Sequence, residues 1–114
     1  MKKIKVGIVG TGNAAEMHYL AAKSLKNVEL VSIYGKNTKR LLKRSKEWGL
    51  KIYNNVFNMT KKEQLDLIIV CNQNNLHADS ALQALKAGAN ILIEKPIDAN
   101  FLKAKKLIQF SQKQ

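Results

Sequence analysis

The sequence lacks several features that would assign it to a particular class of protein. Its 114 residues contain one cysteine, Cys71, so no internal disulfide can form and we expect a reducing compartment. No apolar run approaches the roughly 20 residues that a transmembrane helix needs. The basic start, Met1–Lys5, leads into a predicted strand rather than into a signal peptide. These absences predict a cytoplasmic protein without a membrane partner.

Acidic and aromatic residues are also scarce. The chain has 8 Asp and Glu against 20 Lys and Arg, a formal net charge of +12, and only 6% aromatic residues. A basic excess makes nucleic acid a candidate partner. The basic residues are spread over most of the chain, however, and no zinc-finger spacing or helix-turn-helix pattern can be placed. We therefore favour a lysine-rich solvated surface, with nucleic-acid binding as an alternative.

A glycine turn stands near the start of the chain. The residues after the first apolar segment have the spacing Gly-x-Gly-x-x-Ala and are Gly10, Thr11, Gly12, Asn13, Ala14 and Ala15. In dinucleotide-binding domains the first glycine allows a tight turn, and the second lets the backbone approach a pyrophosphate. The N–H groups at the start of the following helix then face the phosphates. By itself, this spacing also fits an ordinary turn between a strand and a helix.

Strand-like and helix-like segments alternate along residues 1–114, which are long enough for one domain. The segments that predict strands are Lys2–Val9, Val28–Tyr34, Lys51–Tyr53, Leu67–Val70 and Ile91–Ile93. The segments that predict helices are Ala14–Leu25 capped by Asn13, one from Asn37 or Thr38 to Trp48, a brief one opening at Thr60–Glu63, one capped by Asn75 that runs through Ala87, and about Asn100–Gln112. This alternation predicts an α/β fold: a three-layer, doubly wound parallel sheet (Rossmann) with strand order 3-2-1-4-5.

Small and polar residues gather where the predicted strands end. These clusters are Gly10–Ala15, Gly35–Asn37, Cys71–His77 and Glu94–Pro96. Ligands of doubly wound sheets bind at the carboxyl ends of the strands. We therefore predict that the clusters converge on one crevice between the first and fourth strands.

Three stretches resemble the motifs of the glucose–fructose oxidoreductase and inositol dehydrogenase family (Gfo/Idh/MocA). They are Gly10-Thr11-Gly12-Asn13, Asn74-Asn75-Leu76-His77 and Glu94-Lys95-Pro96. The resemblance covers the whole chain but only the N-terminal dinucleotide-binding domain of that family. It implies a nicotinamide dinucleotide as partner, and sugars, inositols or related polyols as substrates of hydride transfer. It also implies that Lys95 is catalytic, near the nicotinamide, and that Asn74 and the residues just before it line the nicotinamide side.

The chain departs from the pattern of this family at three points. Asn72-Gln73 stands where Thr-Pro is frequent, which affects the shape of that loop. The acid often found after the second strand is missing. The second domain of the family, which carries an Asp…His catalytic pair and holds the substrate, has no room in 114 residues. We therefore expect this chain to be part of a longer oxidoreductase and to be inactive alone.

The missing acid bears on the choice of cofactor. In NAD-preferring domains, an acid about 20 residues past the glycines binds the ribose 2′-hydroxyl. Here Ile33–Arg40 contains no acid and offers Lys36, Asn37, Thr38 and Arg40 to a 2′-phosphate. No acid occurs in the basic run Lys36–Lys46 either, and like charges at helical spacing repel, so a compensating anion is expected. The sequence therefore predicts NADP rather than NAD.

The candidate cofactor-binding residues are Gly10, Thr11, Gly12, Asn13, Ala14, Gly35, Lys36, Asn37, Arg40, Cys71, Asn72, Asn74, His77, Glu94 and Lys95. Several have a simpler interpretation: His77 could support the start of its helix, and Cys71 could be inert packing. His18, inside the first helix, fits a structural role better than a cofactor contact. No metal site is predicted, because Cys71 and His77 lack a third ligand. A non-catalytic module that senses a dinucleotide stays an alternative, and the oligomeric state is not predicted.

Overall fold

The computed structural model describes residues 2–95 and 101–113. The strands are β1 (Ile4–Val9), β2 (Val28–Tyr34), β3 (Lys51–Ile52), β4 (Leu67–Val70) and β5 (Asn90–Ile93). The helices are α1 (Asn13–Lys23), α2 (Thr38–Trp48), α3 (Val56–Glu63), α4 (His77–Lys86) and α5 (Phe101–Lys113), and a 3-10 turn, η1 (Asn74–Leu76), precedes α4. Pro96 of the predicted strand-end motif and Asn100 of the predicted last helix lie outside the described residues.

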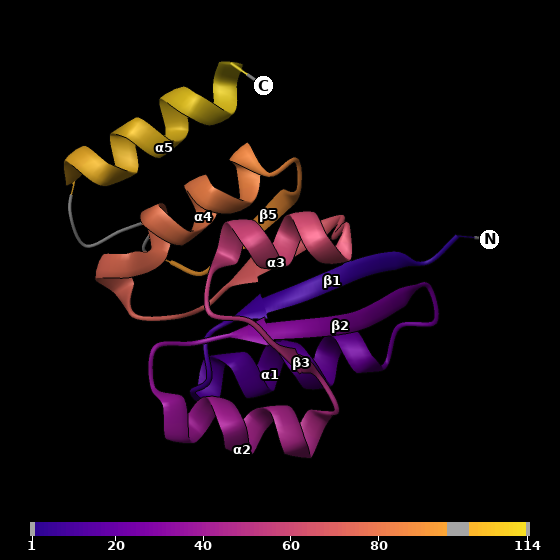
Figure 1. Ribbon diagram of the computed structural model, residues 1–114. Coiled ribbons are helices and arrows are strands. Elements are labelled where there is room, and N and C mark those ends of the chain that lie inside the picture. The colour runs from indigo at the N-terminus through magenta and orange to yellow at the C-terminus, as the bar shows by residue number, and fades with distance from the viewer. Residues whose placement is uncertain (1, 96–100, 114) are drawn as a thin grey trace.

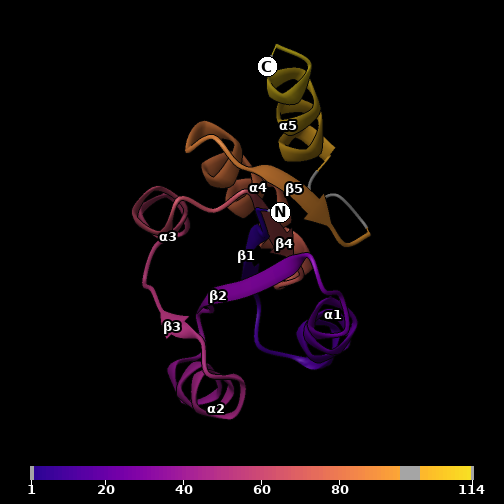
Figure 2. The ribbon, with the colours of Figure 1, turned by 90° about the vertical axis from the view of Figure 1, so that its right-hand side faces the viewer.

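The strands form a 5-stranded sheet of order β3-β2-β1-β4-β5 in which all neighbours are parallel. This order confirms the doubly wound α/β fold predicted from the alternation of segments. Helices α1 and α2 lie on one face of the sheet, and α3 and α4 lie on the other, with α5 beyond α4 (Figures 1 and 2). Because the strands are parallel, their carboxyl ends share one edge, where the predicted site residues follow.

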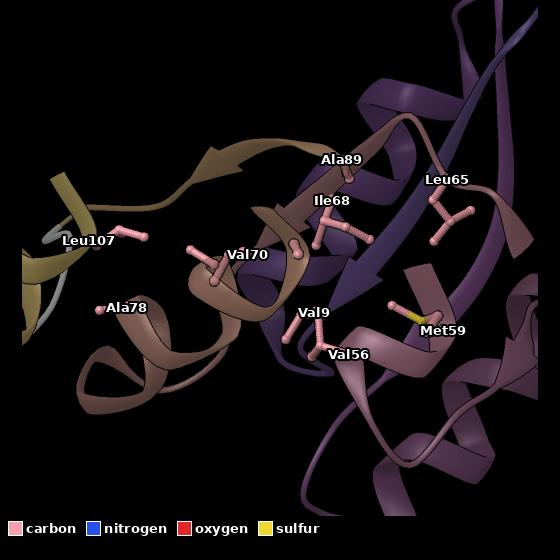
Figure 3. Packing of buried hydrophobic residues seen from close by; sticks show 11 residues of the cluster. Val9, Val56, Met59, Leu65, Ile68, Val70, Ala78, Ala89 and Leu107 are labelled. Carbon is pink, nitrogen blue, oxygen red and sulfur yellow. The ribbon is translucent and has the colours of Figure 1, made fainter. Parts of the chain in front are cut away.

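Two apolar clusters fill the spaces between the three layers. Ile8 and Ile33 belong to the cluster with Tyr19 of α1 and Leu41 of α2. The other cluster joins strand residues to α3, α4 and Leu107 of α5, and it is drawn in Figure 3. The last four residues of β1 are all buried, as expected for a strand that helices cover on both faces. None of the helices within residues 2–95 and 101–113 could cross a membrane.

The predicted caps of α1 and α4 are wrong. Gly12, rather than Asn13, is the N-cap of α1, and Asn13 is already helical. Helix α4 begins at His77 after Leu76, whereas Asn75 lies within η1. In both places the residue before the helix belongs to a turn at the edge of the sheet. No side chain caps either helix.

Helix α3 begins earlier than the capping-box spacing at Thr60 predicts. Its N-cap is Asn55, whose side chain accepts a hydrogen bond of 2.9 Å from the backbone N–H of Asn58. Thr60 therefore lies inside the helix, buried, and its hydroxyl donates a hydrogen bond of 2.8 Å to the carbonyl of Val56. An internal hydrogen bond to the preceding turn satisfies this hydroxyl, which is why a threonine is tolerated in the core.

Candidate functional site

The site begins at the turn that follows β1. Gly10 has a φ of +134°, and a Cβ atom there would lie 2.7 Å from the carbonyl oxygen of Cys71. The backbone N–H of Gly10 donates to the carbonyl of Tyr34 at 2.8 Å, and that of Cys71 donates to the carbonyl of Val9 at 2.8 Å. The turn is therefore held between the ends of β2 and β4, and only glycine fits at residue 10.

A glycine stands at residue 12 for a different reason than at residue 10. Its φ is −89°, which any residue adopts, and a Cβ atom built there has no neighbour within 4 Å. Neither backbone conformation nor packing requires a glycine at this position. The missing side chain instead leaves open space at the amino end of α1, where backbone N–H groups attract anions.

A cavity of about 450 Å³ lies at this edge of the sheet, within the usual range for ligand pockets. The predicted site residues that line it are Gly10, Thr11, Gly12, Asn13, Ala14, Gly35, Lys36, Asn37, Arg40, Cys71 and Asn72. Gln73 and Leu76 line it as well; both lie within the predicted cluster Cys71–His77, although neither is among the candidate cofactor-binding residues. Their position on the loop after β4, which faces the glycine turn, is the feature that could have identified them as site residues.

The end of β2 carries a second close approach. A Cβ atom at Gly35 would lie 2.6 Å from the Cγ2 methyl of Thr11, whose side chain is buried. The threonine methyl thus occupies the space that a side chain at residue 35 would need. Beyond Gly35, Asn37 caps α2 by accepting a hydrogen bond of 3.0 Å from the backbone N–H of Arg40. Lys36 and Arg40 remain the cations of this part of the cavity wall.

One arginine of the basic run pairs with acids that lie outside the run. Arg44 forms ion pairs with Glu16 of α1 at 2.9 Å and with Glu47 at 3.3 Å. The prediction that the run Lys36–Lys46 has no acid to pair with is therefore wrong for Arg44. Glu16 comes from a different helix, and Glu47 lies one residue beyond the run.

The predicted residue His77 lies beside the cavity and is not among its described lining residues. His77 is 1% exposed, and its Nε2 atom is hydrogen-bonded to the carbonyl of Asn72 at 2.7 Å. This hydrogen bond ties His77 to the loop that carries Asn72. Asn74 begins η1, directly after Gln73.

Glu94 and Lys95 also lie at the carboxyl edge, beyond the end of β5. The backbone N–H of Glu94 donates to the carbonyl of Val70 at 2.9 Å, which continues the pairing of β4 with β5. The side chain of Glu94 accepts a hydrogen bond from Nε2 of His18 on α1. Lys95 is exposed. The structure therefore ties Glu94 to α1 and brings Lys95 to the same edge as the glycine turn.

Cys71 lines the cavity and is a buried thiol. It is 7% exposed, and burial, followed by the negative charge of Glu94, raises its pKa to about 12. A thiol must ionise to act as a nucleophile or a strong metal ligand. Among the described residues, no group of three His, Cys, Asp or Glu could hold a metal ion.

The parallel sheet, the glycine turn at the amino end of α1 and the cavity beside them define a dinucleotide-binding Rossmann domain. Residues 4–114 match the model of the Gfo/Idh/MocA oxidoreductase family, NAD-binding Rossmann fold, and the chain belongs to this family. Glucose-6-phosphate 3-dehydrogenase of Bacillus subtilis is 36% identical over 93 residues, which cover 82% of this chain and 26% of the relative.

Solved structures share this fold. Biliverdin reductase from Synechocystis, crystallised with biliverdin and NADP+, is 28% identical with a TM-score of 0.86, covering 96% of this chain and 35% of that one. Myo-inositol dehydrogenase from Lactobacillus casei, in complex with NAD(H) and myo-inositol, has a TM-score of 0.89 at 22% identity, covering 98% and 34%. The chain spans between 26% and 35% of the length of these relatives.

We expect Cys71 to resist alkylation in the folded chain. At pH 8, a pKa of about 12 instead of 9.0 lowers the thiolate fraction about a thousandfold. Iodoacetamide labelling followed by mass spectrometry should be slow for the native chain and fast after unfolding in urea. Rapid labelling of the native chain at pH 8 would contradict this assignment.

The same raised pKa sets the sign of a pH effect on stability. The unfolded chain loses the thiol proton near pH 9.0, whereas the folded chain keeps it until about pH 12. The contribution of Cys71 to folding is therefore intact below pH 9.0 and falls as pH rises between these values. Urea unfolding of a Cys71→Ala variant should show a weaker loss of stability over this window.

Proposed function

We propose that this chain is the cofactor-binding domain of an oxidoreductase that acts on sugars, inositols or related polyols, with NADP as cofactor. When bound, the nicotinamide dinucleotide supplies or accepts a hydride. The observation that carries the proposal is the open space at Gly12, beside the amino end of α1, in a cavity lined by Lys36 and Arg40. In this proposal the glycine turn binds the pyrophosphate, and the end of β2 binds the adenosine ribose. The cytoplasmic location stays a prediction from the single cysteine.

Replacing Gly12 by valine tests the pyrophosphate site. A Cβ atom at residue 12 meets no neighbour within 4 Å, so the variant should fold. It should, however, fill the space that a pyrophosphate needs. Loss of even one charged hydrogen bond weakens binding about 10- to 150-fold, which a fluorescence titration with NADPH would detect.

The matched control is Ala21→Val, which adds the same branched side chain at an exposed position of α1. Ala21→Val should bind NADPH like the unmodified chain. Circular dichroism should show the same helix content for both variants. Normal binding by a folded Gly12→Val chain would refute the assignment of the pyrophosphate site.

The preference for NADP rests on the end of β2. A carboxylate there would bind the 2′-hydroxyl of NAD and repel a 2′-phosphate, whereas this chain has Gly35 followed by Lys36 and Asn37. The guanidinium of Arg40 can form bidentate hydrogen bonds to a phosphate. Because Thr11 fills the space next to Gly35, an acid at residue 35 would require Thr11 to move.

We expect NADPH to bind about 10- to 150-fold more tightly than NADH, the range expected for one charged hydrogen bond. Arg40→Met should remove most of this difference by weakening NADPH alone. Lys46→Met, on an exposed position of the same helix, removes equal charge and should leave the ratio unchanged. NADH binding that equals NADPH binding in the unmodified chain would refute the preference.

A variant designed to prefer NADH over NADPH tests the role of Thr11 in the same titrations. Gly35→Asp alone should weaken both cofactors, because its Cβ atom would lie 2.6 Å from the Thr11 methyl. With Thr11→Ala added, the nearest atom of residue 11 would be Cβ at 3.7 Å, an ordinary contact. The double variant should therefore bind NADH better than NADPH. A Gly35→Asp chain that prefers NADH without the second change would show that Thr11 places no such limit.

We further propose that Lys95 orients the substrate oxygen and that these 114 residues alone do not complete the reaction. Lys95 is exposed, and hydride transfer requires the reacting carbon held about 3–3.5 Å from its partner atom. It also requires a positioned proton donor or acceptor. In this proposal, a second domain supplies both, as well as the wall that holds the substrate.

The chain mixed with NADP and a panel of sugars and inositols should produce no reduced cofactor above background at 340 nm. Normal NADP binding in the same sample is the control that separates inactivity from misfolding. Turnover that disappears in a Lys95→Ala variant would contradict the need for a second domain, while supporting the role of Lys95.

A further inference from the structure

Arg44 joins α2 to the glycine turn without lining the cavity. Its Nε atom donates a hydrogen bond of 3.1 Å to the carbonyl oxygen of Thr11, the residue between the two glycines. Its Nη1 atom forms ion pairs with Glu16 and Glu47. The side chain of Arg44 is only 15% exposed, whereas those of Glu16 and Glu47 are 49% and 43% exposed. The hydrogen bond to Thr11 is therefore more shielded from solvent than the two ion pairs.

Stacked rings fix the position of this guanidinium. The Cζ atom of Arg44 lies 4.8 Å from the centre of the Trp48 ring. The Trp48 ring in turn stacks on Tyr19 of α1, with a centroid distance of 4.4 Å and an interplanar angle of 8°. An arginine held by stacking and by two acids loses little further entropy when it binds a carbonyl. The Arg44–Trp48–Tyr19 column is therefore a preorganised support between α1 and α2.

The bond to Thr11 determines how the next peptide group is turned. The carbonyl of Thr11 and the N–H of Gly12 belong to one planar peptide unit, and in a trans peptide they point in opposite directions. A carbonyl held towards α2 therefore turns the Gly12 N–H away from α2. Gly12 lines the cavity, and this N–H is one of the donors available to an anion at the start of α1.

The pairing with Glu16 has a second effect at the same place. Glu16 lies in the first turn of α1, where its negative charge would oppose a bound pyrophosphate. The positive charge of Arg44, 2.9 Å away, offsets it. Both interactions of Arg44 therefore favour an anion at the glycine turn.

We propose that Arg44 is a positioning residue for the pyrophosphate: it orients the Thr11–Gly12 peptide and neutralises Glu16. This inference rests on the proposed function of the cavity. It predicts a pattern different from that of Arg40. Because the pyrophosphate is common to both cofactors, loss of Arg44 weakens NADPH and NADH equally and leaves their ratio unchanged.

The test compares Arg44→Met and Arg44→Lys with the control Lys43→Met, which removes a charge at an exposed neighbouring position. Titrations with NADPH and NADH are made at a temperature where circular dichroism shows every variant to be folded. Both Arg44 variants should bind each cofactor about tenfold more weakly, as expected for one charge-assisted hydrogen bond. Arg44→Lys should not restore cofactor binding. The single ammonium group of lysine cannot contact Thr11 and Glu16 together in the fixed geometry of a guanidinium group.

Amide hydrogen exchange supplies a readout that does not require a ligand. The amides of residues 12–15 should exchange faster in Arg44→Lys than in the unmodified chain, with no change in β1. Affinities and exchange equal to those of Lys43→Met would overturn the inference, as would an effect confined to NADPH. If Arg44→Met does not fold, the affinities and the exchange rates of Arg44→Lys alone test the inference. If the unmodified chain binds neither cofactor, the proposed function fails, while the exchange data still report on the role of Arg44.

Discussion

The absence of a side chain at Gly10 is the constraint on which the rest of the site depends. The backbone of this residue passes so close to the Cys71 carbonyl that a Cβ atom would lie 2.7 Å from it. Hydrogen bonds to Tyr34 and from Cys71 to Val9 hold the turn between β2 and β4. The start of α1 is therefore placed by the sheet itself, which makes its backbone donors a rigid feature rather than a flexible loop.

Thr11 transmits this constraint to the end of β2. Its methyl group occupies the space beside Gly35, and its carbonyl accepts the hydrogen bond from Arg44. Thr11 thus limits which side chain can stand at residue 35, and Arg44 of α2 holds the Thr11 carbonyl in place. A change at Gly35 would disturb the glycine turn as well as the end of β2, so we expect substitutions at residues 11 and 35 to have non-additive effects on stability.

The features that the sequence could predict are those set by local patterns. Apolar runs separated by short helical segments were sufficient for the strand order, and the glycine spacing located the turn at Gly10 and Gly12. The pair Arg44–Glu16 could not be found this way, because its partners are 28 residues apart on different helices. The start of α3 was missed for a related reason: Thr60 matches a capping pattern, but packing buries it in the middle of the helix.

Helix α1 adds a side-chain link between the glycine turn and the far strand β5, whose carboxyl end already shares one edge of the parallel sheet with that turn. Its amino end faces the cavity, and one turn later His18 binds the side chain of Glu94, which follows β5. The backbone of Glu94 is also paired to Val70 of β4. Two independent bonds therefore fix Glu94 relative to the start of α1, and they limit where its exposed neighbour Lys95 can reach. The same helix thus links the glycine turn to the strand end that carries the candidate catalytic lysine.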